Sequence, residues 1–387
     1  MNRLALRLPV FHANMETLLF SILLIVEIFN GFGIKPLYLA VGLMLMGFAA
    51  MSFFAIKKYG LETRMFRLAF LWTAYHMLWA GMEMSGRTFY TCFQHIALFL
   101  VFIMVFEGEK LGLQKGDIKM VYRIIHYFVL FFLLFIVFMR PSLSATFESY
   151  VYIGLISIAF VIAEWKGWRY LRVIVLCLTW AVIAYMIKAR AQAVGFVIFI
   201  IASISMPALI QKHNVFVQKL FWVYYTLLNV FPMIYTAVSQ SRFRPILENF
   251  SYQFTRARFF SGRDELWLAV YDKMANPVDY LFGLGFQTTN RITEEMDMSL
   301  HSLYVTIISE GGVLLVILLG LLLYEIWKIL VKNGSYQSSI MLSFLVVFLY
   351  KQSFDISLIE NNLWVAFGVW TALALACADA KECATEK

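Results

Sequence analysis

The apolar positions of this chain form long runs that are separated by short polar segments. A helix needs about 20 mostly apolar residues to cross the hydrocarbon core of a bilayer. Twelve runs are close to that length, so the pattern predicts an all-α polytopic membrane bundle of about twelve transmembrane helices. The runs lie near residues 10–30, 36–56, 65–84, 87–106, 120–140, 148–164, 168–188, 191–210, 216–239, 302–324, 337–351 and 360–379.

One polar segment, residues 240–300, is far longer than the others. Four of its residues recur at the spacing of one helix face: Trp267, Val270, Tyr271 and Met274. Ser261 is a suitable N-cap, so the segment predicts a short helix that begins near Arg263. One interpretation is an amphipathic helix lying on the membrane surface. In the other, Arg263 binds phosphate oxygens at the start of this helix.

The composition agrees with a membrane protein. Of the 387 residues, 61% are hydrophobic and 14% are charged, whereas about a quarter of the residues in a soluble domain are charged. We expect one integral membrane domain over residues 1–387, with residues 240–300 as a long loop carrying short helices. The first apolar run has no small-residue cleavage site, so we expect it to be retained as a span.

The distribution of Lys and Arg predicts the orientation. With the N-terminus placed inside, nineteen of these residues fall in inner segments and six in short outer segments. Cytoplasmic loops collect Lys and Arg, whereas long loops translocate largely regardless of charge. Both termini are therefore predicted to be cytoplasmic, and the loop at 240–300 to face outward. The net charge of +8 is explained in this way, so we do not expect nucleic acid as a partner.

This topology gathers several unusual residues on the outer side. Arg190 lies at a predicted outer helix junction, and His301 begins a span that contains Glu310. Asp355 precedes the last span, and the first part of the outer loop is rich in arginine. These arginines are Arg242, Arg244, Arg256, Arg258 and Arg263. Charged residues near or inside a membrane usually face a cavity and serve a function.

Each of these residues also has a structural interpretation. Arg190 would extend to the interface with its charge in water, and Glu310 would brace the bundle beside two glycines that allow close helix contact. Asp355 would cap the last span. His301 would be structural at the interface. In the functional interpretation, the helix dipole and nearby arginines keep His301 neutral, as a general base requires.

The sequence shows no metal site and no cofactor motif. The four cysteines have neither metal-ligand spacing nor a disulfide framework. A serine nucleophile elbow is also missing. We therefore expect neither a metal ion nor a cofactor.

The order of these motifs resembles the O-antigen ligase and polymerase superfamily of bacterial membrane glycosyltransferases. The matching residues begin with Arg190 and continue with Gly262-Arg263 and Trp267. The turn Gly283-Leu284-Gly285, the segment His301-Ser302-Leu303-Tyr304 and Glu310-Gly311-Gly312 complete the pattern. Ser302 stands where the family usually has asparagine. The resemblance covers roughly residues 185–365, and before them only the series of spans is similar.

The resemblance implies a GT-C-like bundle in the bacterial cytoplasmic membrane. It also implies metal-independent, inverting transfer from an undecaprenyl-diphosphate-linked oligosaccharide. Arg190 and Arg263 would bind the departing diphosphate, and His301 would take the proton of the attacking sugar hydroxyl. Further substrate contacts would come from Trp267, Gly283, Gly285, Tyr304, Glu310, Asp355, Arg256 and Arg258. Membrane lipids, a chain-length regulator and a flippase would be its partners.

Three functions fit these features. A polymerase would move the growing chain onto another lipid-linked repeat unit, and we favour it. A ligase would transfer the finished chain to lipid A-core. A flippase or other transporter of lipid-linked oligosaccharide belongs to a different class, and it would place its arginines in a central cavity. A sensor that only binds glycan is a more distant alternative.

Overall fold

The structure is a computed structural model of the chain. It describes residues 64–84, 86–106, 115–139, 148–163, 169–187, 189–255, 259–260, 262–356, 358 and 363–385. The runs at 10–30 and 36–56, and the candidate residues Arg256 and Arg258, lie outside these residues. The described part of the chain is helical and contains no strand, as predicted.

Helices occupy every predicted apolar run within the described residues. They are α3 (Arg64–Glu83), α4 (Gly86–Phe106), α5 (Lys115–Met139), α6 (Glu148–Ala163), α7 (Arg169–Met186), α8 (Arg190–Ser239), α13 (Leu303–Asn333), α14 (Tyr336–Lys351) and α15 (Leu363–Thr385). The predicted long polar segment contains four short helices. These are α9 (Arg244–Thr255), α10 (Arg263–Lys273), α11 (Pro277–Phe282) and α12 (Phe286–Glu295).

Three helices in the described residues, α5, α8 and α13, are long and apolar enough to cross a membrane. Shorter apolar stretches lie in α6, α7 and α14. The apolar composition thus indicates a membrane protein. The predicted number of twelve spans is not confirmed, because only these three helices of the described residues are long and apolar enough.

The long helix α8 is folded back on itself at His213, where φ is −140° and ψ is 45°. Gly195 lies against Val347, because a Cβ at Gly195 would be 3.2 Å from the Val347 side chain. The Tyr224 hydroxyl donates to the carbonyl of Val346 at 2.7 Å. In a straight helix, Gly195 and Tyr224 would be roughly 40 Å apart at 1.5 Å per residue. Both limbs of α8 therefore pack against the same part of α14, matching the separate runs predicted at 191–210 and 216–239.

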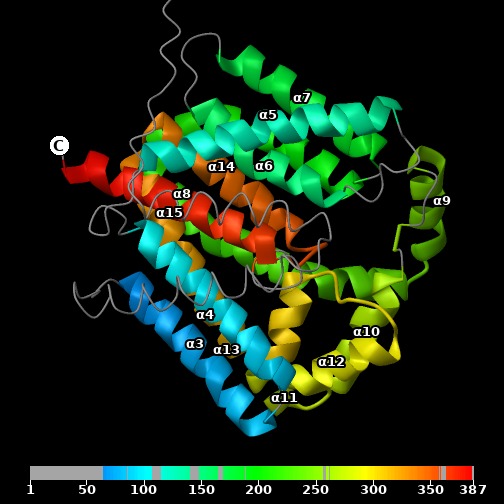
Figure 1. The fold of residues 1–387 in the computed structure, drawn as a ribbon. Coiled ribbons are helices and arrows are strands. Elements are labelled where there is room, and N and C mark those ends of the chain that lie inside the picture. The colour runs from blue at the N-terminus through cyan, green and yellow to red at the C-terminus, as the bar shows by residue number, and fades with distance from the viewer. Residues whose placement is uncertain are drawn as a thin grey trace, which may run out of the picture.

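The helices alternate in direction, so their ends form two groups. At one end, Arg64 pairs with Glu325 at 3.1 Å and Lys119 pairs with Asp379 at 2.6 Å. Helices α9 to α12 lie at the opposite end of the bundle, away from the C-terminus (Figure 1). We call the end with α9 to α12 the outer end and the other the inner end. Within the described residues, the segments predicted to be inner therefore lie at one end of the bundle, and the segments predicted to be outer lie at the other.

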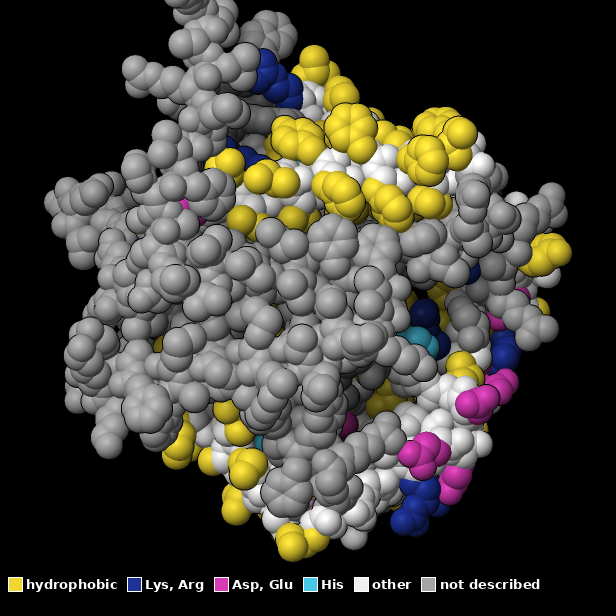
Figure 2. Space-filling view, in the orientation of Figure 1, with side chains coloured by type: hydrophobic (Ala, Val, Ile, Leu, Met, Phe, Trp, Pro, Cys, Tyr) yellow, Lys and Arg dark blue, Asp and Glu magenta, His cyan; other side chains and the backbone are white. Residues whose placement is uncertain are grey.

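Apolar side chains also cover part of the surface of the bundle. On α5 the exposed residues recur every three or four positions: Ile124, Tyr127, Phe128, Phe131, Phe135 and Phe138. They form a broad apolar band over this helix (Figure 2). A soluble monomer rarely exposes so large an apolar patch, and contact with lipid tails accounts for it.

Candidate functional site

Helix α10 is joined to the segment that precedes α13 through Trp267. The Trp267 indole nitrogen donates to the carbonyl of Leu300 at 2.7 Å, and its ring lies 5.0 Å from that of Tyr235. Trp267 is fully buried. Because Leu300 directly precedes His301, this bond holds α10 beside the candidate base. Arg263, the first residue of α10, lies one turn before Trp267.

The interpretation of α10 as a helix lying on the membrane surface is wrong. Its apolar face is buried in the protein through Leu266, Trp267, Val270 and Met274. The expected N-cap is also different, because Gly262 occupies that position with φ of 81° and no side-chain cap bond. Ser261 lies outside the described residues. Glycine adopts this positive φ at little cost, so Gly262 allows the chain to enter α10 sharply.

The chain before Arg263 is held by polar groups that no sequence motif marks. Asp264 is fully buried and pairs with Arg244 at 3.2 Å. The Glu248 carboxylate accepts the backbone N–H groups of Phe259 and Phe260, at 2.8 Å and 3.4 Å. These contacts leave Arg263 half-buried at the helix start, the end of a helix from which the first-turn N–H groups point outward.

His301 lies at the outer end of α13 in an unusual backbone conformation. It is exposed, and its φ is 47°. A positive φ is uncommon for a residue with a side chain, and such strain often marks a functional position. The next residue, Ser302, is buried and caps α13 by accepting the N–H of Val305 at 3.5 Å.

The connection after α14 holds the backbone next to His301. The N–H of Leu303 lies 2.9 Å from the carbonyl oxygen of Gln352 and 3.1 Å from that of Asp355. The Asp355 carboxylate accepts the N–H of Ile356 at 2.7 Å. Asp355 therefore helps to position the His301 segment through its backbone, a role that its sequence context does not reveal.

A polar cavity of about 340 Å³ lies beside this segment. Its lining includes Glu310, which is buried, and residues of α12 and of the chain just before His301. The lining residues are Thr289, Asn290, Thr293, Glu294, Asp297, Met298, Ser299, Leu300, Thr306, Glu310 and Ile356. Hydroxyl, amide and carboxylate groups dominate this lining, and none of its described residues is Lys or Arg. These groups are suited to hydrogen bonding with sugar hydroxyls.

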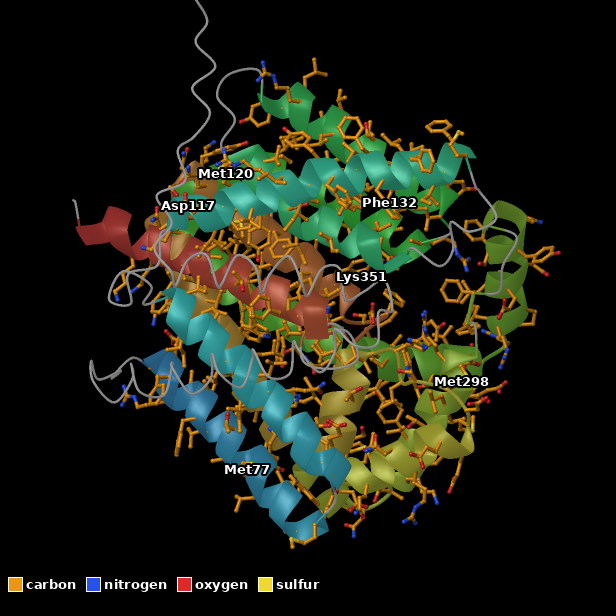
Figure 3. The ribbon with its side chains drawn as sticks, in the orientation of Figure 1. Met77, Asp117, Met120, Phe132, Met298 and Lys351 are labelled. Carbon is orange, nitrogen blue, oxygen red and sulfur yellow. The ribbon has the colours of Figure 1, made fainter. Side chains whose placement is uncertain are left out.

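Arg190 reaches the same end of the bundle from α8. It is half-buried at the first position of that helix. Gly195 packs on Val347 near the end of α14, and the residue directly after α14 is Gln352, whose carbonyl binds Leu303. The space-filling view shows a hollow at the outer end where basic side chains lie beside a histidine (Figure 2). Lys351 and Met298 lie on two sides of this region (Figure 3).

Gly283 and Gly285 serve close packing in the structure. A Cβ at Gly283, where φ is 85°, would lie 2.5 Å from the backbone carbonyl of Glu310. The helix α13 is broken nearby at Gly312, with φ of 63°, and the N–H of Leu284 donates to the carbonyl of Ser309 at 2.6 Å. The glycine turn is thus inserted at the break in α13. The resemblance predicts substrate contacts for both glycines, and the structure gives them this positional role.

Glu83 completes the support of this turn from α3. Its carboxylate accepts the N–H of Gln287 at 3.0 Å and the hydroxyl of Thr88 at 2.7 Å. A Cβ at Gly285 would collide with this carboxylate. The Tyr75 hydroxyl lies 2.9 Å from the carbonyl oxygens of both Phe282 and Gly311. No local pattern marks Tyr75 or Glu83 for this role, because the turn that they support is distant in the sequence.

Trp267 and Tyr304 have no ring face open to a sugar in this structure. Both side chains are buried, and the Tyr304 hydroxyl donates to the carbonyl of Leu349 at 2.8 Å. Burial gives both rings a structural role in place of the substrate contacts that the resemblance implies for them. Trp267 fixes α10 and Tyr304 fixes the start of α13 to α14.

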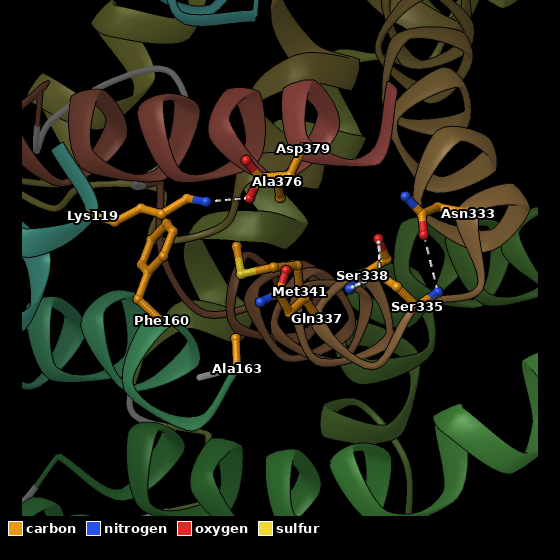
Figure 4. Close-up of a pocket in the computed structure, with 10 residues that line it drawn as sticks. All are labelled: Lys119, Phe160, Ala163, Asn333, Ser335, Gln337, Ser338, Met341, Ala376 and Asp379. Carbon is orange, nitrogen blue, oxygen red and sulfur yellow. Dashed lines mark hydrogen bonds and ion pairs between the residues drawn. The ribbon is translucent and has the colours of Figure 1, made fainter. Parts of the chain in front are cut away.

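A second, small pocket lies at the inner end of the bundle. Its volume is about 30 Å³, and Lys119 and Asp379 form an ion pair in its lining (Figure 4). Asn333 and Ser335 also line it and form local hydrogen bonds at the junction of α13 and α14. A cavity of this size holds about one water molecule, so the larger cavities of the outer end are the better candidates.

The described part of the chain contains no group of three or more His, Cys, Asp or Glu side chains placed to hold a metal ion. Comparison with protein-family models, with curated proteins and with solved structures finds no match for this chain. The function must therefore be argued from the residues of the site.

Proposed function

We propose that this chain is a polysaccharide polymerase of the cytoplasmic membrane. It would transfer a glycan from undecaprenyl diphosphate to a sugar hydroxyl of another lipid-linked repeat unit. In this proposal the chain has about twelve spans, both termini are cytoplasmic, and the outer end faces away from the cytoplasm. The separation of predicted inner and outer segments to opposite ends of the bundle supports this topology.

In the proposed reaction, the acceptor hydroxyl oxygen attacks the anomeric carbon of the donor sugar. The bond from that carbon to the phosphate oxygen breaks, and the diphosphate leaves with the electron pair. His301 takes the proton of the acceptor hydroxyl. Arg190 and Arg263 bind the diphosphate as its negative charge increases. The attack occurs opposite the leaving group, so the configuration at the anomeric carbon inverts.

The observation that carries the proposal is the arrangement around His301. An exposed histidine in a strained conformation lies next to a cavity whose polar lining suits a sugar. The Trp267–Leu300 bond brings the helix of Arg263 to the same place. A base, a polar acceptor cavity and an arginine at a helix start are the groups that this transfer requires.

Incubation of the purified protein with lipid-linked repeat units alone tests the proposal. A ladder of longer glycans is the expected result, and it should be lost in Arg190→Ala and Arg263→Ala. Lysine at either position should restore only part of the activity, because a point charge lacks the planar fork of arginine. Transfer that requires lipid A-core would identify a ligase instead. Flipping of the lipid without covalent change would identify a transporter and contradict the proposal.

A further inference from the structure

A second large cavity lies between α9 and α10, with a volume of about 410 Å³. The described residues in its lining are Arg244, Glu248, Asn249, Tyr252, Phe260, Gly262 and Glu265. None of these residues lines the cavity beside His301. We call this second cavity the α9–α10 groove.

The floor of the α9–α10 groove is built from groups that bind one another. Arg244 pairs with the buried Asp264 at 3.2 Å, and its guanidinium lies 5.6 Å from the centre of the Phe260 ring. Glu248 accepts the N–H of Phe260, and the Tyr235 hydroxyl donates to the Phe260 carbonyl at 2.8 Å. The charges of the floor are therefore committed to holding its shape, and the groove is formed before any ligand binds.

The rim of the groove carries a different set of groups. Asn249, Tyr252 and Glu265 are all exposed, and Tyr252 is 55% accessible. An aromatic ring packs against the apolar C–H face of a sugar ring. An amide and a carboxylate bind its hydroxyls as donor and acceptor. This combination fits a carbohydrate. An anionic phosphate would meet the carboxylates of Glu265 and Glu248, and Arg244, the cation among the described lining residues, is already paired with Asp264.

We propose that the α9–α10 groove binds the glycan portion of the lipid-linked donor. Gly262 and Glu265, which line the groove, flank Arg263 in the sequence. A glycan whose diphosphate is bound by Arg263 therefore begins at the edge of the groove and extends into it. The cavity beside His301 then receives the acceptor sugar. This inference rests on the proposed function, since it takes Arg263 as the diphosphate ligand.

Photo-crosslinking in the cell that naturally contains the protein tests the inference even while the sugars of the glycan are unidentified. The full chain carries p-benzoylphenylalanine in place of Asn249 or, separately, Tyr252. Irradiation should give adducts that stain for carbohydrate and form a ladder. The same replacement at Val223, which is exposed on α8, should give none. Adducts with protein or lipid only, or no adduct at both groove positions, would overturn the inference.

A kinetic comparison separates a binding role from a folding role. For Tyr252→Ala, we expect the KM for lipid-linked repeat units to rise roughly 3- to 10-fold with kcat unchanged, as lost ring contact predicts. Phe250→Ala is the control, because Phe250 is exposed on the same helix but does not line the groove. Equal KM values in the two variants would contradict the inference.

The two proposals can fail separately. If glycan adducts form at the groove but transfer does not depend on Arg263 or His301, the proposed function fails and the groove remains a glycan site. If transfer depends on both residues and no glycan adduct forms, only the groove inference fails.

Discussion

At the scale of single residues, His301 combines exposure with a strained backbone. Its φ of 47° is held on one side by the Trp267 bond to Leu300 and on the other by the bonds of Leu303 to the connection after α14. Strain of this kind costs about 1–3 kcal/mol and persists only where the surroundings impose it. The surroundings of His301 therefore fix its backbone conformation.

His301→Asn removes the imidazole and keeps a residue that tolerates the backbone conformation at this position. Asparagine adopts a positive φ more readily than most residues, so we expect the unfolding temperature of the variant to stay near that of the wild type. Transfer should fall by about 100- to 10,000-fold, the usual contribution of a general base, while donor binding persists. Met84→Gly relieves a similar φ of 50° elsewhere and should leave transfer unchanged. Loss of donor binding in His301→Asn would make the histidine a ligand contact instead.

Gly283→Ala tests the close contact between the glycine turn and α13. The added Cβ would lie 2.5 Å from the Glu310 backbone at a φ of 85°, so we expect destabilisation of at least about 1–3 kcal/mol from backbone strain alone. Denaturant unfolding in detergent measures it. Gly81→Ala is the matched control, because a Cβ there meets nothing within 4 Å and should stabilise α3 by about 0.5–1 kcal/mol. Equal stability of the two variants would contradict the packing role.

At the scale of elements, the short helices of the outer end are attached to the bundle by a few bonds between distant residues. Trp267 connects α10 to the start of α13. Leu284 connects the glycine turn to the break in α13, and Glu83 connects α3 to the start of α12. The Trp267 bond is buried, and a buried polar group is costly to leave without a partner. The position of Arg263 relative to His301 depends on these attachments.

Trp267→Phe removes one attachment while keeping an aromatic ring. It leaves the buried Leu300 carbonyl without its donor, so we expect a loss of about 1–3 kcal/mol in stability together with reduced transfer. Trp327→Phe removes a similar buried bond, from Trp327 to the Val217 carbonyl at 3.0 Å, within the bundle at a distance from α10. It should lower stability by a comparable amount and leave transfer per folded molecule unchanged. If transfer per folded molecule fell equally in both variants, Trp267 would contribute only to the stability of the fold and not to the position of Arg263.

At the scale of the whole molecule, the alternating helices place the cavity beside His301, the α9–α10 groove and the candidate arginines at one end. The inner end carries ion pairs such as Lys119–Asp379 and only a small pocket. Apolar side chains are exposed between the two ends, as on α5. This distribution is expected when the middle of the bundle contacts lipid and one end contains the chemistry.

Cysteine labelling tests this arrangement in cells. In a variant without Cys92 and Cys383, cysteine at Asp272 on α10 should react with a membrane-impermeant maleimide added outside. Cysteine at Lys332, near the end of α13, should react only after permeabilisation. Both positions are exposed, and the remaining Cys177 and Cys377 are buried. Labelling of position 272 only after permeabilisation would place the site on the cytoplasmic side and contradict the proposed function.

Much of the helical bundle is readable from local composition. The length of an apolar run reflects the thickness of a bilayer, so the apolar helices from α3 to α15 fall on predicted runs, and even the reversal within α8 follows from the polar residues near His213. The presence of a helix beginning at Arg263 follows in the same way from periodicity. These properties depend on residues near one another in the chain, and for that reason a single sequence is enough to predict them.

The arrangement of the site required the tertiary structure. The partners of Trp267, Gly283 and Glu83 are distant in the sequence, and no local pattern marks them. Whether an aromatic ring faces a sugar or the protein interior depends on which helix covers it, and Trp267 and Tyr304 are both covered. The exposed Tyr252 has no motif of its own, because the groove it lines exists only when α9 and α10 meet. Long-range packing is a property of the folded chain as a whole, since each contact forms only when both distant segments are already in place.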